Sequence, residues 1–480
     1  MSDLNDALRF AADIAADHLN AVPRGPVWQP VPEPDREWLT GQPLPLTGRP
    51  LRELLDDVRE RVLPHPMGNG HPRFFGWVNS PPSPAGVLVA APSAALNPSC
   101  AGGDHAGALL ERTAVRWLAE LVGFPHPPGA GLLTSGASMA TVIALATARQ
   151  RAVHRQGLNV RATGLYGSAP LAVYLPAEGH SCLRKAVELL GLGGQYTRTV
   201  PVDRAFRLDP GELRRLISAD LDAGVRPFLI AASAGTVNTG AVDPLNEVAD
   251  IAEAHGMWFH IDGAYGALGV LAERARPAFT GLERADSLVI DPHKWLGVPV
   301  DCGCVLFRDP AGPRGTFSLV PAYLEDDSDD LGWFSEYGPE QTRPFRALRV
   351  WATIAHLGRD GVTRLVRATT GLAATLADMI DSAADFDLLA PAVTSVVAFR
   401  YRPASLDDGA VEALNRAIPA AVQRRGRAFL TGTRLSGSAV LRACILHPDT
   451  TEGDLQVLLD EIRDAAGETE PGNRCGRRAG

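Results

Sequence analysis

Short apolar runs alternate with helical stretches through the middle of the chain. Runs of four or five apolar residues between turn-forming residues predict buried strands, and they occur at Leu171–Leu175, Phe228–Ala232, Trp258–Ile261, Ser287–Ile290 and Cys304–Phe307. The clearest intervening helix is Pro244–His255, which Asp243 can cap and Gly256 can end. Buried strands that alternate with helices predict an α/β domain with a mostly parallel sheet.

The flanking regions follow other patterns. Residues 1–95 are rich in proline and show helical patches at Asp3–Leu19 and Pro50–Val62, without strand signals. Further helices are expected at Gly107–Val122 and after Ser138. Beyond residue 356 a small α+β unit is expected from two strands and two helices, namely Ser395–Tyr401, Ala439–Ile445, Asp408–Gly426 and Thr451–Ala466. We therefore predict an amino-terminal arm (1–95), a large domain (96–355), a small domain (356–466) and a disordered tail (467–480).

Composition narrows the class of protein. A chain of 480 residues exceeds one hydrophobic core. Its net charge of −9 argues against a nucleic-acid partner. Neither a signal-peptide pattern nor an apolar run of about 18 residues is found, so we expect no membrane association and a cytoplasmic location. The six cysteines form only one close pair, Cys302 and Cys304, and no metal site is expected.

Lysine is almost absent, which makes its positions informative. The chain has two lysines, and Lys294 lies in the string Asp291-Pro292-His293-Lys294-Trp295 just after a predicted strand. A primary amine can form an imine, a task that arginine cannot perform. A lysine in this setting, with Asp262 also at a strand end, suggests an enzyme that uses pyridoxal 5'-phosphate (PLP).

Other residues meet the remaining needs of PLP. Its ring nitrogen needs an acid such as Asp262, its phosphate needs a helix start such as Thr134–Ser138, and its ring needs a stacking partner such as His180. Each feature alone has a structural explanation: a strand-end cap, helix capping or a structural histidine. Together with Thr236 and Lys294 they follow predicted strands, so they are expected at one edge of the sheet, where ligands bind.

These segments carry a family resemblance. The chain resembles the group II PLP-dependent amino-acid decarboxylases, which act on aromatic amino acids, glutamate, histidine and cysteine sulfinate. The matching segments are His71–Phe75, Leu133–Ala140, Ala177–Leu190, Ala234–Pro244, His260–Gly266, Ala285–Trp295 and Arg343–Trp351. The resemblance implies PLP-dependent fold type I, with a large seven-stranded-type sheet, a small carboxy-terminal domain and an amino-terminal arm. It also implies an obligate homodimer with active sites at the interface.

The resemblance assigns roles by position. Lys294 would form the Schiff base, Asp262 would pair with the pyridine nitrogen, and His180 and Ala264 would face the two sides of the ring. The phosphate would be held by Ala137, Ser138 and His293, with Thr236 near the ring substituents. The chain has Ala137 where the family has glycine, which is tolerable if the backbone there is not left-handed. It also has Gly263 where the family has alanine.

The family's proton donor is a tyrosine on a mobile loop. The corresponding loop here is Leu324–Arg343, within which Tyr337 fits best, and Tyr323 is a poorer candidate. The alternative is that Tyr337 is merely exposed on a loop. Family members that lose this tyrosine or the stacking histidine can form aldehydes, so the presence of both favours plain decarboxylation.

The substrate is open between two chemistries. Phe74, Phe75 and Trp77 suit an aromatic or large apolar side chain, whereas Arg73 could pair with an acidic one. We expect decarboxylation of an aromatic or large apolar L-amino acid to its amine. The alternatives are an acidic substrate, an aminotransferase, an aldolase-like lyase, aldehyde formation, or a scaffold without activity, which the intact Lys294 and Asp262 disfavour.

Overall fold

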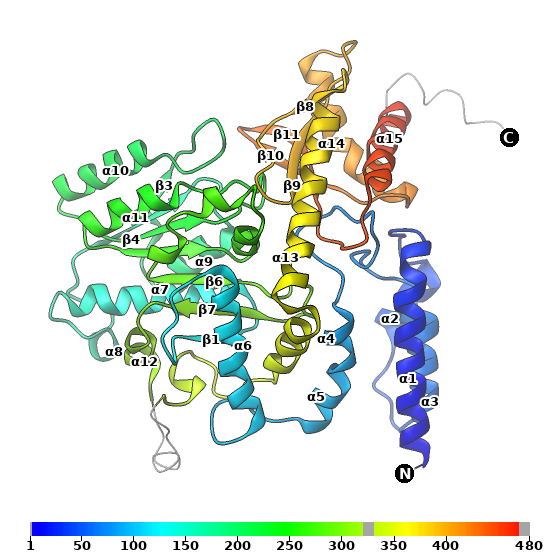
Figure 1. Ribbon diagram of the computed structural model, residues 1–480, viewed down its shortest axis with the longest axis horizontal. Coiled ribbons are helices and arrows are strands. Elements are labelled where there is room, and N and C mark those ends of the chain that lie inside the picture. Colours follow the sequence, from blue (N-terminus) through cyan, green and yellow to red (C-terminus); the bar gives the residue numbers. More distant parts are fainter. Residues whose placement is uncertain (1, 320–330, 470–480) are drawn as a thin grey trace. The chain divides into compact units, whose positions relative to one another are not determined.

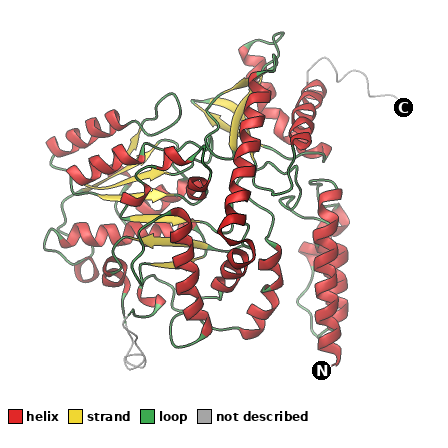
Figure 2. Ribbon diagram, viewed as in Figure 1, coloured by secondary structure: helices red, strands yellow, loops and turns green. Residues whose placement is uncertain are grey.

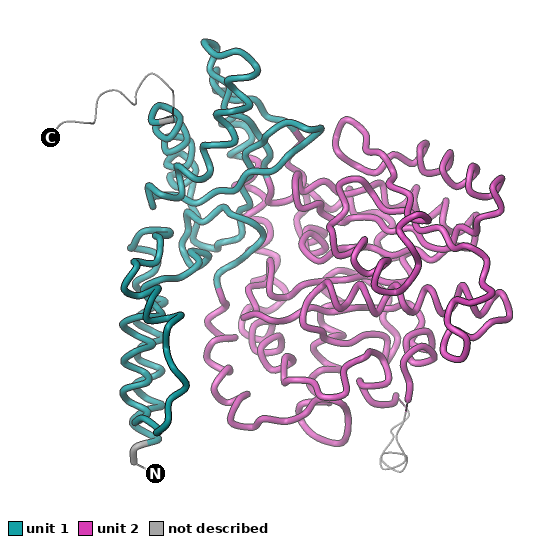
Figure 3. The backbone as a smooth tube through the Cα atoms, turned by 180° about the vertical axis from the view of Figure 1, so that it is seen from behind, with its two compact units in different colours: residues 1–81, 375–389, 397–480 teal, residues 82–374, 390–396 magenta. Residues whose placement is uncertain are grey.

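The computed structural model describes residues 2–319 and 331–469 and divides into two compact units (Figure 3). The larger unit contains residues 82–374 and 390–396, and the smaller contains residues 1–81, 375–389 and 397–480. Helix α13 (Arg346–Asp381) begins in the larger unit and ends in the smaller one, with a kink at Gly358. The four-part division predicted from the sequence stays a prediction.

A seven-stranded sheet forms the centre of the larger unit, in the order β1-β7-β6-β5-β4-β2-β3 (Figure 1). The strands are β1 (Gly131–Thr134), β2 (Leu171–Pro176), β3 (Thr197–Val200), β4 (Arg226–Ser233), β5 (Trp258–Asp262), β6 (Ser287–Ile290) and β7 (Gly303–Phe307). Only β7 runs antiparallel to its neighbours. The predicted α/β fold with a mostly parallel sheet is confirmed, and the five predicted strands lie within β2, β4, β5, β6 and β7.

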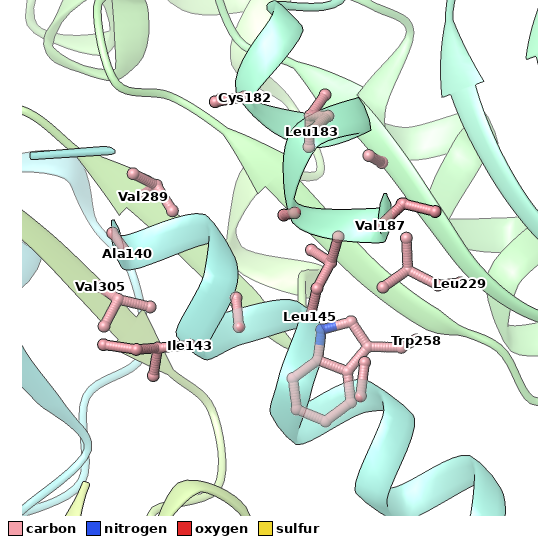
Figure 4. Packing of buried hydrophobic residues seen from close by; sticks show 14 of the residues in the cluster. Ala140, Ile143, Leu145, Cys182, Leu183, Val187, Leu229, Trp258, Val289 and Val305 are labelled. Atoms are coloured by element: carbon pink, nitrogen blue, oxygen red, sulfur yellow. The ribbon is translucent and has the colours of Figure 1, made fainter. Parts of the chain in front are cut away.

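Helices cover both sides of this sheet, which explains why central strands such as β2 and β5 are buried along their whole length (Figure 1). Helices α7 (Ala137–His154) and α9 (Ser181–Leu189) pack over a core that includes Leu145, Val187 and Leu229 (Figure 4). Helices α10 (Pro210–Asp222) and α11 (Leu245–Ala254) contact β3, β4 and β5. The remaining helices of this unit are α4 (Pro84–Leu88), α5 (Ala90–Leu96), α6 (Ala106–Val122), α8 (Val160–Thr163) and α12 (Ala311–Phe317).

The predicted helix after Asp243 is confirmed as α11, but the predicted cap is wrong. No side chain caps α11, and the buried Asp243 carboxylate instead accepts hydrogen bonds from the backbone N–H groups of Leu208 and Ser233, each at 2.7 Å. Burial raises the pKa of Asp243 to about 6. The Asp243 carboxylate therefore links the end of β4 to Leu208, which lies 35 residues before Asp243 in the chain, a contact that local sequence does not reveal.

The smaller unit combines a four-stranded sheet with helices (Figure 2). Its strand order is β10-β11-β9-β8, with β8 (Phe386–Leu388), β9 (Val396–Tyr401), β10 (Thr431–Leu435) and β11 (Ser438–Cys444). Its helices are α1 (Ser2–Ala21), α2 (Glu33–Gly41), α3 (Leu51–Asp57), α14 (Asp408–Arg425) and α15 (Glu452–Thr469). Among the described residues, no helix has the length and apolar character needed to cross a membrane.

Candidate active site

Six strands of the large sheet run in one direction, so their carboxyl ends share one edge. Asp262 is the last residue of β5 and lies level with Ser233 on β4 and Val289 on β6. The turn that carries Asp291, His293 and Lys294 directly follows β6. We call Asp262, Asp291, His293 and Lys294 the strand-end cluster. The cluster lies at the carboxyl edge of the sheet, which is the edge where α/β sheets bind ligands.

Hydrogen bonds fix both ends of the turn that carries Lys294. The Asp291 N–H donates to the carbonyl of Ala264 at 3.0 Å, and the Lys294 N–H donates to the carbonyl of Asp291 at 2.9 Å. The Trp295 indole N–H donates to Thr369 Oγ1 at 2.9 Å. The Lys294 ammonium lies 3.0 Å from Asp291 Oδ2, and a fifth of its side chain is exposed (20%). The amine is therefore both positioned and reachable.

Asp291 has one carboxylate oxygen without a donor. Its Oδ2 pairs with Lys294, but the buried Oδ1 has no hydrogen-bond partner within the described residues. Gly303 lies beside it, because a Cβ at Gly303 would come within 2.8 Å of this oxygen and 2.5 Å of the Gly136 Cα. A buried carboxylate oxygen without a hydrogen-bond donor lowers stability. The surroundings of Asp291 are therefore better explained by a role in chemistry than by packing.

The start of α7 offers an anion site. No side chain caps this 18-residue helix, and its first turn has no acidic residue. The His293 ring lies close to Gly136, since a Cβ there would be 3.5 Å from His293 Cε1. Backbone N–H groups at Ala137 and Ser138, with the helix dipole, favour a phosphate here. The positive φ falls on Gly136 (152°) and Ala137 is helical, so alanine meets the condition expected from the sequence.

Asp262 and His180 approach each other from β5 and the start of α9. Asp262 is 8% exposed, and its Oδ1 accepts a hydrogen bond from the Ala264 N–H at 3.1 Å. One side-chain ligand atom each from His180, Cys182 and Asp262 lies within 4.8 Å of the other two. His180 Nδ1 accepts the Cys182 N–H at 3.3 Å, which orients an exposed imidazole ring. The carboxylate and the ring thus occupy the same end of the sheet as Lys294.

Thr236 and Tyr337 make other contacts in this structure. The Thr236 hydroxyl lies 2.9 Å from that of Thr239 and accepts the Ala241 N–H at 3.2 Å, so it stabilises its own turn. Tyr337 is buried, and its hydroxyl donates to the Leu331 carbonyl at 2.5 Å, beside Gly129 ahead of β1. The alternative that Tyr337 is exposed on a loop is therefore wrong. Its role as proton donor stays a prediction, and Tyr323 lies outside the described residues.

The predicted substrate residues belong to the smaller unit. Phe74 is buried and stacks on Phe429 with ring centroids 4.8 Å apart, and Phe75 is fully buried. Arg73 Nε lies 3.9 Å from Asp454 Oδ1. Trp77 is 46% exposed, the largest exposure among the three aromatic candidates. We call Val27, Trp28, Phe74, Trp77 and Phe429 the aromatic cluster; the substrate role of its members stays a prediction.

Three residues of the site were not identified from the sequence. Asp291 lies three residues before Lys294, a spacing that signals an i, i+3 pair. Gly303 lies between Cys302 and Cys304, and no local signal shows its close approach to Gly136. Cys182 lies two residues after His180, and no local signal shows that its thiol faces Asp262. The contacts of Gly303 and Cys182 join segments that are far apart in the chain.

Comparison with known proteins identifies the family. The model described as "Pyridoxal-dependent decarboxylase conserved domain" matches residues 35–402. The chain belongs to this family. An aromatic-L-amino-acid decarboxylase from Bacillus atrophaeus is 31% identical over 97% of this chain and 96% of its own. A phenylacetaldehyde synthase from Arabidopsis thaliana is 29% identical, covering 95% of this chain and 94% of its own.

Solved structures agree with this assignment. The crystal structure of Oryza sativa TDC with PLP and tryptamine has a TM-score of 0.89 and 27% identity, and the match covers 98% of each chain. The predicted fold type I is thereby confirmed. This pyridoxal-dependent decarboxylase is a carboxy-lyase whose cofactor is PLP. The site fits that cofactor, because it presents an amine, a carboxylate and an anion-binding helix start on one edge.

Proposed function

We propose that this decarboxylase converts an aromatic L-amino acid to its amine and CO2, with Lys294 as the residue that binds the cofactor. The observation that carries the proposal is the 3.0 Å pair between Lys294 and Asp291 on the same sheet edge as Asp262. The aromatic preference is supported by relatives named aromatic-L-amino-acid, tryptophan and tyrosine decarboxylases. These relatives favour the aromatic substrate over the acidic alternative.

Each residue of the site has a separate proposed role in binding PLP. Lys294 supplies the amine for the cofactor aldehyde, and Asp291 holds that amine in place. Asp262 would pair with a ring nitrogen of bound PLP, and the start of α7 with Ser138 and His293 would bind its phosphate. His180 and Ala264 would contact the ring, and Thr236 would support the neighbouring turn. Bound PLP supplies an electron sink for the bond that breaks on loss of CO2.

The chain's two lysines make the central assignment easy to test. Borohydride reduction of the PLP-loaded enzyme, followed by peptide mapping, should place the cofactor on Lys294 and leave the exposed Lys185 of α9 unmodified. Label on Lys185, or on neither lysine, would overturn the assignment. The measurement does not depend on knowing the substrate.

The substrate assignment needs a product assay. Mass spectrometry after incubation with tyrosine, tryptophan, phenylalanine, glutamate and aspartate should detect an amine only from the aromatic members. An amine from glutamate or aspartate alone would move the specificity role to Arg73. An aldehyde in place of an amine would instead match the relative named phenylacetaldehyde synthase.

The proton donor can be tested by the same assay. We propose that the Tyr337 hydroxyl delivers a proton to the substrate Cα, which requires it to leave both the Leu331 carbonyl and its place beside Gly129 ahead of β1. Tyr337→Phe removes that proton, so amine formation should fall about 100-fold or more while substrate consumption falls less. Equal amine yields from the variant and the parent would assign the proton to another group.

We also propose that the enzyme is a homodimer with its active sites at the interface. Large apolar side chains are exposed in each unit considered by itself, including Leu88 and Val300 in the larger and Leu44 and Leu46 in the smaller. Light scattering on the purified protein should give twice the chain mass of 51.0 kDa. Mixing the Lys294→Ala and Tyr337→Phe variants should restore amine formation if both chains contribute to each site.

A further inference from the structure

The Cys182 thiol lies between two polar groups from different elements. Its Sγ is 3.8 Å from Thr141 Oγ1 on α7 and 3.9 Å from Asp262 Oδ2 at the end of β5. All three side chains are buried, and Cys182 is at the start of α9 (Figure 4). These distances suit sulfur, a larger and weaker hydrogen-bonding atom than oxygen. Three elements of the fold therefore meet at one thiol.

The directions of the hydrogen bonds among Thr141, Cys182 and Asp262 follow from which groups can donate and which can accept. Burial and the nearby charge of Asp262 raise the pKa of the Cys182 thiol to about 12, so sulfur keeps its proton at neutral pH. An ionised carboxylate only accepts, so the S–H donates to Asp262 Oδ2. The sulfur then accepts from the Thr141 hydroxyl. Since Oδ1 accepts from the Ala264 N–H at 3.1 Å, both carboxylate oxygens are tethered.

A simpler explanation is that Cys182 only fills space. Buried cysteine often behaves as a small apolar residue, and Cys182 is part of the apolar core below α7 and α9. Cys304 in β7 is an example of a space-filling cysteine, because the one hydrogen-bond partner of its thiol among the described residues is the carbonyl of the next residue, Val305, at 3.8 Å. Cys182 differs because its two polar contacts are side chains, and one of them belongs to the strand-end cluster.

We propose that Cys182 is a positioning residue that fixes the Asp262 carboxylate for the ring nitrogen of the cofactor. The inference rests on the proposed function, because it assumes that Asp262 faces that nitrogen. Thr141 supports the thiol from α7, the helix whose first turn is proposed to bind the phosphate. The thiol thus joins the residue that holds the ring to the helix that holds the phosphate.

The test is cofactor affinity, measured by titrating apoenzyme with PLP and following absorbance. Cys182→Ala removes the donor and should weaken the PLP dissociation constant about 5- to 10-fold, because hydrogen bonds to charged groups exceed neutral ones in strength. Cys182→Ser keeps a donor and should stay within about 2-fold of the parent. Thr141→Val, which removes only the hydroxyl, should weaken binding by a smaller factor. Cys304→Ala is the matched loss of a buried thiol and should change nothing.

A double-mutant cycle separates positioning from packing. If Cys182 acts through Asp262, adding Cys182→Ala to Asp262→Asn should change the dissociation constant by less than about 2-fold. An undiminished effect in the Asp262→Asn background, or an equal effect of Cys304→Ala, would reduce Cys182 to a packing residue. So would unchanged affinity in Cys182→Ala. If Cys182→Ala fails to fold, Cys182→Ser and Thr141→Val decide the matter.

The same data distinguish this inference from the proposed function. Unchanged affinity in Asp262→Asn would remove Asp262 from the cofactor site, and the proposed roles would fail with it. Weakened affinity in Asp262→Asn but not in Cys182→Ala would leave the proposed function standing and overturn the role of Cys182. The position of the bound cofactor's visible absorbance band is a second readout, which should shift in Cys182→Ala and return in Cys182→Ser.

Discussion

The strand-end cluster and the aromatic cluster differ in what they bury: charged groups in the first and apolar rings in the second. The strand-end cluster buries charged groups, leaves Asp291 Oδ1 without a partner among the described residues, and leaves no room for a Cβ at Gly303. The aromatic cluster buries apolar rings that stack closely, as Phe74 does on Phe429. Both clusters contain residues that the sequence predicted to contact a small molecule. Only the first has features that packing alone does not explain.

This difference separates function from stability in physical terms. Buried, incompletely paired charges lower stability, so a fold retains them where they serve a reaction. Buried aromatic rings raise stability, and that alone accounts for Phe74. Within the aromatic cluster, the half-exposed Trp77 has surface left for a ligand. Substitutions in the two clusters should therefore affect different measurements.

The largest effect should come from Lys294. Lys294→Arg keeps a cation beside Asp291 but cannot bond to the cofactor aldehyde, so kcat should fall by more than about 1,000-fold. Folding should be retained, as judged by circular dichroism. Lys185→Arg is the matched control at an exposed position of α9 and should keep full activity. Substantial activity in Lys294→Arg would mean that the strand-end cluster is not the reaction centre.

The aromatic cluster should respond in stability. Phe74→Ala removes a fully packed ring, so the free energy of unfolding should fall by about 3–5 kcal/mol. Trp77→Ala should cost less stability, because almost half of that side chain is exposed (46%), and should raise KM if it contacts substrate. Urea denaturation and steady-state kinetics measure both. The reverse result, with Phe74→Ala changing only KM, would erase the distinction between the clusters.

A pH effect should appear in both units. Burial lowers the pKa of His260 in the larger unit and of His71 in the smaller to about 4, with the nearby Arg73 also lowering that of His71. The unfolded chain takes up these protons near pH 6.5. Stability should therefore be full above that pH and fall towards pH 4, by up to about 3 kcal/mol per histidine.

Single substitutions can assign this loss. Asparagine offers an oxygen near the position of Nδ1, so His260→Asn and His71→Asn can keep the contacts to Ser287 and to the Arg73 N–H. Each should flatten the decline in unfolding free energy between pH 7 and pH 4.5. A slope identical to that of the parent would show that the histidine is already protonated in the folded state or accessible to water.

The smallest effect concerns two glycines. Gly303→Ala places a Cβ 2.5 Å from Gly136 Cα and should cost about 1–3 kcal/mol of stability through overpacking, with weaker PLP binding. Gly371→Ala on α13 meets nothing within 4 Å and should gain up to about 1 kcal/mol. Thermal melting with and without PLP compares them. Equal melting temperatures would show that the corner beside Asp291 adapts freely.

The sequence predicted what is local. The apolar runs located five strands because each is buried on both faces, and the string around Lys294 marked the site because lysine is otherwise nearly absent. Strand β3 (Thr197–Val200) was missed because it is a short edge strand with polar residues. The contacts of Asp243, Cys182 and Gly303 were missed because their partners are more than five residues away in sequence, and only the fold brings them together.

The common direction of the six parallel strands has a practical consequence for protein engineering. Loops that lead into these strands lie at the edge remote from Lys294. The turn before β2 is one of them, with Tyr166 88% exposed and no atom within 4 Å of a Cβ built on Gly167. A peptide tag or a fluorescent domain inserted at Gly167 should therefore leave the strand-end cluster undisturbed.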